Sequence, residues 1–100
     1  KEVPRQSEGE WEMKVLVFSS RDCRACKSMK QALTILGKRH GFEVAEYFVE
    51  DDLEVFQQFG VAGTPVSVVL DDDAEEVGRF IGHQTETSVE NILKQYGCIE

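Results

Sequence analysis

Apolar runs and helical apolar patterns alternate along the chain and predict seven elements in the order β-α-β-α-β-β-α. The unbroken apolar run 15–18 lies inside MKVLVFSS (13–20) and is typical of a strand buried on both faces. The next segment repeats apolar residues at helical spacing, namely Cys26, Met29, Ala32, Leu33 and Leu36. Further strands are predicted at 42–49, 65–70 and 75–81, and a short helix is predicted at 50–60.

The last predicted helix has a clear apolar stripe and two candidate N-caps. The stripe consists of Val89, Ile92, Leu93 and Tyr96. Thr87 and Glu90 match a capping box, and Thr85 is the alternative cap.

The order of the elements predicts an α/β fold with a mixed central sheet and helices on both faces. Because helices join the first three strands, we expect these strands to pair in parallel through right-handed crossovers. A hairpin turn at 71–74 then adds an antiparallel strand. Residues 1–12 are interpreted as a polar arm or linker remnant, 13–97 as one domain, and 98–100 as a C-terminal tail.

Charge and length narrow the classes of function. The chain has 100 residues and a net charge of −8, which disfavours nucleic-acid and membrane-surface roles because phosphates and anionic lipids are repelled. No apolar run approaches the roughly 18 residues of a membrane span, and we expect a monomer. The compartment is unknown. The cytoplasm is slightly favoured, and a periplasmic or other extracytoplasmic location is the alternative, because the chain starts at Lys1 and a removed signal peptide leaves no trace.

Two of the three cysteines, Cys23 and Cys26, lie where the first strand gives way to the first helix. With Asp22 as the expected N-cap, both thiols lie on one helix face within reach of a disulfide. The helix N-terminus and Arg24 stabilise a thiolate at Cys23, whereas Asp22 opposes it. Cys26 lies deeper. This difference between an ionised Cys23 and a deeper Cys26 suits thiol–disulfide exchange, in which Cys23 attacks a substrate disulfide and Cys26 resolves the mixed disulfide.

Three other roles for the pair compete with exchange chemistry. Zinc needs four ligands, and Cys98, His40 and His83 are not at finger or ribbon spacing, so no metal site is expected. A purely structural disulfide would close a tiny loop and remove little entropy. Two inert core thiols stay an alternative for a lone CxxC motif, although its place in a βαβ unit favours the redox role. We expect Cys98, near the C-terminus, to be a bystander thiol, and a regulatory partner of the pair is the alternative.

Three blocks of sequence within residues 13–96 resemble the thioredoxin superfamily in order and spacing. The first block, VLVFSSRDCRACK, resembles the strand, turn and CxxC motif of the family. The second block, FGVAGTPVSVVL, resembles the segment that carries the cis-proline of the family. The third block, FIGHQTETSVENIL, resembles the last strand and the last helix of the family. The resemblance implies a thioredoxin-like fold, with Cys23 as nucleophile, Cys26 as resolving thiol, and Thr64 and a cis Pro65 docking the substrate. It also implies electron transport to protein disulfides from a donor such as thioredoxin reductase or glutathione, with no cofactor besides the redox-active disulfide.

The chain departs from the typical thioredoxin pattern around the cysteines. Asp22 stands where a typical thioredoxin has tryptophan, and Arg24-Ala25 stands where it often has Gly-Pro. Val17 stands where it has a buried aspartate, and Glu46 stands where it has the lysine that commonly accompanies this aspartate. The element order resembles a glutaredoxin, but IGHQTE matches the glutathione signature of that group only in part. A glutathione-linked, glutaredoxin-like reductase and a redox-sensing or binding module of a larger protein are therefore alternatives. The direction and potential of the redox reaction are not predicted.

Glu46 and His83 are candidates for modulating the cysteines. Cys26 must lose its proton to react, and Val17 cannot accept it. Strand alternation sets Glu46 between two apolar residues of one face, so we hypothesise that Glu46 is partly buried beneath Cys26 and acts as a general base. The alternative is an exposed glutamate near a strand edge. In the implied fold His83 lies in a loop near the cysteines, where it stabilises the Cys23 thiolate or contacts substrate, or is a solvated loop histidine.

Overall fold

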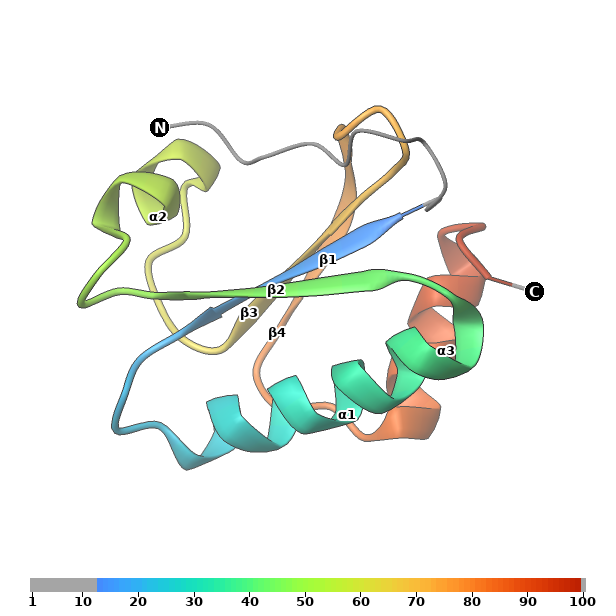
Figure 1. The fold of residues 1–100 in the computed structure, drawn as a ribbon, viewed down its shortest axis with the longest axis horizontal. Helices are drawn as coiled ribbons and strands as arrows, with labels where there is room; N and C mark the ends of the chain where they lie inside the picture. The colour runs from blue at the N-terminus through green and yellow to red at the C-terminus, as the bar shows by residue number, and fades with distance from the viewer. Residues whose placement is uncertain (1–12, 100) are drawn as a thin grey trace.

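The computed structural model describes residues 13–99, which form a four-stranded sheet and three helices (Figure 1). The elements are β1 (Lys14–Ser19), α1 (Arg24–His40), β2 (Glu43–Phe48), α2 (Leu53–Phe59), β3 (Val66–Leu70), β4 (Glu76–Ile81) and α3 (Glu86–Gln95). The predicted element order is confirmed, while the predicted arm, residues 1–12, lies outside the described residues. Within residues 13–99, no helix combines the length and apolar character needed to cross a membrane.

The sheet has the strand order β2-β1-β3-β4 and is mixed, as predicted, but one expected pairing is wrong. β1 and β2 are parallel, whereas β3 pairs with β1 in the antiparallel direction, and β4 is antiparallel to β3. The cause is the length of α2. A helix of 7 residues spans about 10 Å, which is too short to carry the chain back along a strand of about 20 Å. β3 therefore starts at the end of the sheet where β2 stops.

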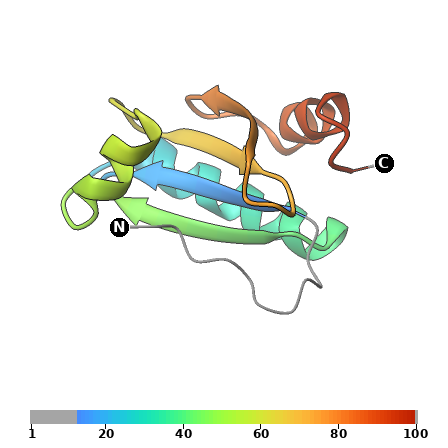
Figure 2. The ribbon, with the colours of Figure 1, turned by 90° about the horizontal axis from the view of Figure 1, so that it is seen from above.

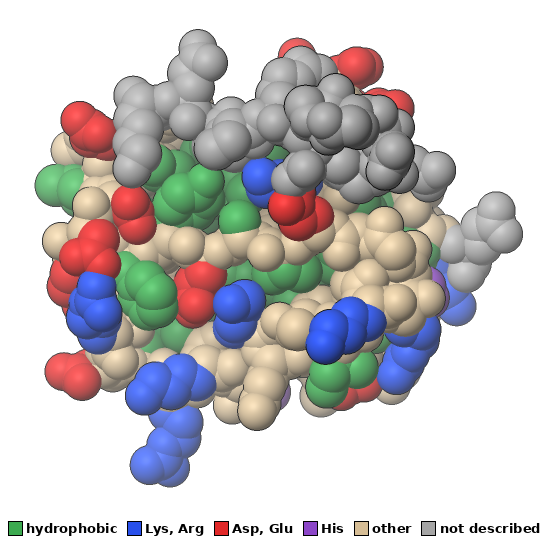
Figure 3. All heavy atoms as spheres, in the orientation of Figure 1, with side chains coloured by type: hydrophobic (Ala, Val, Ile, Leu, Met, Phe, Trp, Pro, Cys, Tyr) green, Lys and Arg blue, Asp and Glu red, His purple; other side chains and the backbone are tan. Residues whose placement is uncertain are grey.

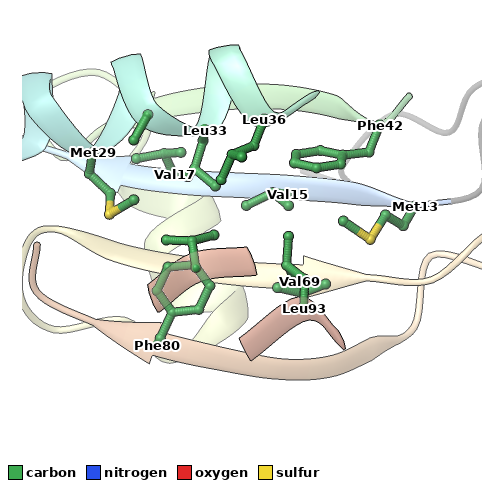
Figure 4. Close-up of a cluster of buried hydrophobic side chains, with 12 residues drawn as sticks. Met13, Val15, Val17, Met29, Leu33, Leu36, Phe42, Val69, Phe80 and Leu93 are labelled. Atoms are coloured by element: carbon green, nitrogen blue, oxygen red, sulfur yellow. The ribbon is translucent and has the colours of Figure 1, made fainter. Parts of the chain in front are cut away.

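The sheet separates two apolar clusters. The larger cluster packs α1 and α3 against one face through residues such as Leu33, Leu36, Val15 and Leu93 (Figure 4). The smaller cluster packs α2 against the other face, with Phe18 at its centre. In Figure 2 the sheet passes between α2 and α1. Every residue of β1 is buried because β1 is a central strand covered on both faces, which explains its unbroken apolar run.

α3 is capped by Thr85, and its other predicted cap is wrong. The Thr85 side chain accepts a hydrogen bond from the Ser88 N–H at 3.1 Å, and Thr87 lies inside the helix. Glu90 does not close a capping box because its carboxylate is engaged with α1. It lies 2.8 Å from Nε2 of His40 and 3.0 Å from Nη1 of Arg39, so it joins the two helices.

The parallel pairing of β1 and β2 determines where the site lies. Ser19 and Phe48 end the two strands at the same edge of the sheet. From Ser19 the chain continues through residues 20–23 into α1. Ligands and reactive groups of open α/β sheets collect at the carboxyl ends of parallel strands, and the two neighbouring cysteines lie at this edge.

Candidate active site

Cys23 and Cys26 form a disulfide at the start of α1. Their Cα atoms are 5.2 Å apart, within the range that disulfides usually span. The two residues differ in exposure, since Cys26 is 1% exposed and belongs to the core, whereas Cys23 is half-buried. Cys23 is therefore the more accessible of the two residues.

Cys23 is the N-cap of α1, so the prediction that Asp22 is the cap is wrong. Cys23 has extended backbone angles, and its Sγ accepts a hydrogen bond from the Cys26 N–H at 3.1 Å. The helix therefore begins at Arg24, one residue later than expected. At the cap position, Sγ of Cys23 lies at the free N–H groups of the first helical turn, one of which, that of Cys26, donates to it. In the reduced protein these N–H groups and the positive end of the helix stabilise a thiolate.

Thr64 and Pro65 lie beside the loop that leads to Cys23. The Thr64–Pro65 peptide bond is cis in the structure. Oγ1 of Thr64 lies 3.2 Å from Oγ of Ser20, and the Pro65 carbonyl accepts a hydrogen bond from the Gly82 N–H at 2.8 Å. The contact with Ser20 places Thr64 next to the loop that leads to Cys23.

Glu46 is partly buried on the α1 side of the sheet, whereas its role as a general base stays a prediction. It pairs in register with Val17, and its side chain is 17% exposed. The Ser19 hydroxyl donates a hydrogen bond to Oε2 of Glu46 at 2.9 Å, and Nζ of Lys30 lies 3.5 Å from Oε1. Glu46 and Cys26 line the same groove between α1 and β2. Ser19 and Lys30 thus hold a carboxylate in the groove that the buried cysteine also lines.

Arg21 connects the loop 20–23, which leads to Cys23, with the segment before α2. The sequence did not indicate this role. Its guanidinium pairs with Asp51 and lies 5.0 Å from the centroid of the Phe48 ring. Its backbone N–H points at both carboxylate oxygens of Glu50, at 3.2 and 3.3 Å. The only signal in the sequence was the opposite charge of Arg21 and of the acidic run 50–52.

The remaining candidate residues lie at the surface. Asp22, Arg24 and His83 are exposed. His83 follows Gly82, which bonds to Pro65, but no hydrogen bond or ion pair joins it to either cysteine among the residues that the structure describes. The modulating roles of these three residues stay predictions.

Cys98 lies at the opposite end of the sheet from the redox pair. It lines a groove with Met13, which precedes β1, and with Asp71, which follows β3. Burial raises the pKa of the Cys98 thiol, and the negative charge of Asp71 acts in the same direction. The structure therefore keeps Cys98 apart from the other two cysteines, consistent with a bystander thiol.

Comparison with known proteins agrees with this geometry. A family model described as a thioredoxin-like domain matches residues 3–97. The SPbeta prophage-derived thioredoxin-like protein YosR of Bacillus subtilis is 30% identical over 83 residues, which are 83% of this chain and 98% of that protein. The resemblance stated from the sequence is confirmed.

Solved thioredoxin structures have the same fold. A mutant thioredoxin from Halobacterium salinarum matches with a TM-score of 0.79 at 22% identity, covering 88% of this chain and 77% of that one. The thioredoxin of Fasciola hepatica matches with a TM-score of 0.76 at 24% identity, covering 89% and 85%. Together, the fold and the Cys23–Cys26 pair support a thiol–disulfide oxidoreductase in general terms.

Proposed function

Because the chain belongs to the family of thioredoxin-like domains, we propose that it exchanges disulfides with protein substrates through Cys23 and Cys26. One observation carries the proposal: the half-buried Cys23 caps α1 and is bonded to the buried Cys26. An accessible thiolate next to a protected thiol is the arrangement that two-step exchange requires.

In the reducing direction the reaction has two displacements. The Cys23 thiolate attacks one sulfur of a substrate disulfide, whose bond breaks, and the other substrate sulfur leaves as a thiolate and takes a proton. Cys26 then loses its proton and attacks Sγ of Cys23, which breaks the mixed disulfide and releases the second substrate thiolate. The substrate gains two electrons, and the Cys23–Cys26 pair loses two. The oxidising direction is the same sequence reversed.

Thr64 is the proposed docking residue for the substrate backbone. It is half-buried, and its hydroxyl touches Ser20 of the loop that precedes Cys23. A substrate segment lying beside Cys23 therefore passes close to the Thr64 backbone groups. Hydrogen bonds there would orient the scissile disulfide for in-line attack.

Glu46 is the proposed acceptor of the Cys26 proton. The Cys26 thiol is buried, and burial disfavours its charged form. The Glu46 carboxylate lines the same groove and is held by Ser19 and Lys30. A proton passed from Cys26 to this carboxylate makes the resolving thiolate at the moment when it is needed.

The test follows the redox state of the pair in both directions. We expect the reduced protein to become oxidised by a disulfide-bonded protein, or the oxidised protein to become reduced by a dithiol protein. The Cys23→Ser variant should be slower by at least about a hundredfold, because the nucleophile is lost. Turnover with thioredoxin reductase and with glutathione then identifies the donor class. Exchange in neither direction, or an active Cys23→Ser variant, would contradict the proposal.

A further inference from the structure

A groove of about 570 Å³ runs along α1 beside the redox pair. It is lined by Arg24, Lys27, Lys30 and Ile35 of α1 and by Glu46 and Phe48 of β2. It also reaches Ser20, whose side chain contacts the proposed docking residue Thr64. From Arg24 to Ile35 the helix rises about 16 Å, which is the length of about five residues of extended chain.

The helix that forms one wall of the groove is basic, although the protein is acidic. α1 contains Arg24, Lys27, Lys30, Lys38 and Arg39 and no acidic residue, in a chain of net charge −8. Arg39 is paired with Glu86 and Glu90 of α3. Within residues 13–99, neither Arg24 nor Lys27 has an ion-pair partner, and both are exposed. These two cations, one turn apart, are available to an incoming anion.

The other side of the site has the opposite charge. Glu50, Asp51 and Asp52 follow β2, and Arg21 is held there by Glu50 and Asp51. In Figure 3, Lys and Arg side chains gather over α1, and Asp and Glu side chains gather at the side where β2 ends. An acidic segment is therefore attracted to the α1 side of the site and repelled from the other.

We propose that this groove binds an acidic, extended segment of the protein partner, on one side of its reactive cysteine. The inference deepens the proposed function, on which it rests. Carboxylates near the cysteine pair with Arg24 and Lys27. The ring of Phe48 offers apolar contact at the cysteine end of the groove, and Ile35, which is 45% exposed, offers it farther along α1. The open groove is longer than a small thiol requires, and its length fits a polypeptide.

The test uses three symmetric peptide disulfides, each made of two copies of a peptide with one cysteine. About four residues on each side of the cysteine are acidic, uncharged or basic. The measured quantity is the second-order rate constant for oxidation of the reduced protein. Each rate constant is divided by that of dithiothreitol with the same peptide, because flanking charge also changes the reactivity of the peptide disulfide itself. Cys98→Ser is the common background, so that only the redox pair reacts.

Lys27→Glu is the test variant, and Lys38→Glu is its matched control. Both reverse one exposed lysine of α1 and change the net charge equally, but Lys38 does not line the groove. We expect the wild type to prefer the acidic over the uncharged peptide by about fivefold. Lys27→Glu should remove the preference and Lys38→Glu should keep it. About 1 M salt should abolish it by screening.

Three outcomes would overturn the inference. If the protein reduces all three peptide disulfides at equal rates, the proposed function stands and the groove does not bind acidic segments. If Lys27→Glu and Lys38→Glu lose the preference equally, net charge and not the groove causes it. If no peptide disulfide oxidises the reduced protein and no peptide thiol reduces the oxidised protein, both the proposed function and this inference are wrong.

Discussion

Cys26 can attack only after its buried thiol loses a proton, so at the scale of single residues the groups around it control the second displacement. Its 1% exposure excludes most water from the sulfur. The neighbouring core residue on β1, Val17, offers no acceptor, and Glu46 lies beside it on β2. The Ser19 hydrogen bond and the Lys30 ion pair fix the orientation of the Glu46 carboxylate.

Glu46→Gln should slow resolution of the mixed disulfide by about tenfold to a hundredfold at neutral pH, because the proton acceptor is lost. The slowing should disappear as the pH rises, since hydroxide then removes the Cys26 proton. Ellman's reagent separates the two steps in a stopped-flow experiment on the Cys98→Ser background. The first release of thionitrobenzoate reports attack by Cys23, and the second, unimolecular release reports attack by Cys26.

The first phase serves as the internal control for this prediction, because Cys23 attacks before Glu46 is needed. Lys30→Gln is a second comparison, since it leaves the carboxylate and removes only its ion pair. A second phase with the same pH profile in wild type and Glu46→Gln would rule out the role and leave water or substrate as the acceptor.

The sequence left two positions open for Glu46 and did not indicate its partners. Strand alternation set Glu46 between two apolar residues, which motivated the hypothesis of partial burial, and an exposed glutamate was the alternative. Ser19 is 27 residues away in the chain and Lys30 is 16, so no local pattern joins them to Glu46. Asp22 was chosen as a cap because carboxylates are common caps. Backbone geometry instead placed the Cys23 sulfur at that position, which a ranking by residue type does not foresee.

At the scale of elements, α1 and α3 are joined by a small charged cluster. Glu90 of α3 lies between His40 and Arg39 of α1, and Arg39 also reaches Glu86. The hydrogen bonds with His40 and Arg39 hold the pKa of Glu90 below its usual range. The carboxylate is thus stabilised in the folded protein relative to the unfolded chain.

The lowered pKa of Glu90 has a defined consequence for stability. A group with a depressed folded pKa contributes stability above its unfolded pKa, and this contribution is lost as the pH falls through the folded pKa. Glu90→Gln should therefore lower the Tm at pH 7 by about 2 °C. The difference from wild type should shrink below about pH 4. Thermal unfolding followed by circular dichroism across this range checks it.

Glu75→Gln is the matched control for Glu90→Gln. Glu75 is exposed in the hairpin, and its side chain forms no ion pair among the residues that the structure describes. Its Tm should follow the wild type at every pH. If the Tm of Glu90→Gln stays below that of the wild type by the same amount down to pH 2, the substitution removes packing contacts and not a charge interaction.

The elements themselves were predictable, but the direction of β3 was not. Apolar periodicity gave all seven elements in order, because each buries one face or both faces against a neighbour. The sequence also indicated a short helix before β3, at 50–60. The error was to treat any intervening helix as a full crossover, when α2 has only 7 residues and leaves the chain at the same end of the sheet.

At the scale of the whole molecule, the fold assembles one reactive edge from distant parts of the chain. The loop after β1 carries Cys23, the segment before β3 brings Thr64 beside it, and β2 supplies Glu46. Cys98 is kept at the opposite end of the sheet. The arrangement places the half-buried Cys23 at the reactive edge, next to the buried Cys26.

Trapping of the mixed disulfide tests this account most directly. Reduced Cys26→Ser and Cys23→Ser variants, both on the Cys98→Ser background, are mixed with a protein that has a single disulfide. Mass spectrometry of a non-reduced digest then locates the cross-link. We predict that Cys26→Ser accumulates a covalent complex through Cys23, because the second displacement is blocked, and that Cys23→Ser forms none. A complex through Cys26 in Cys23→Ser, or no complex with either variant, would contradict the assignment of Cys23 as the nucleophile of a thiol–disulfide exchange.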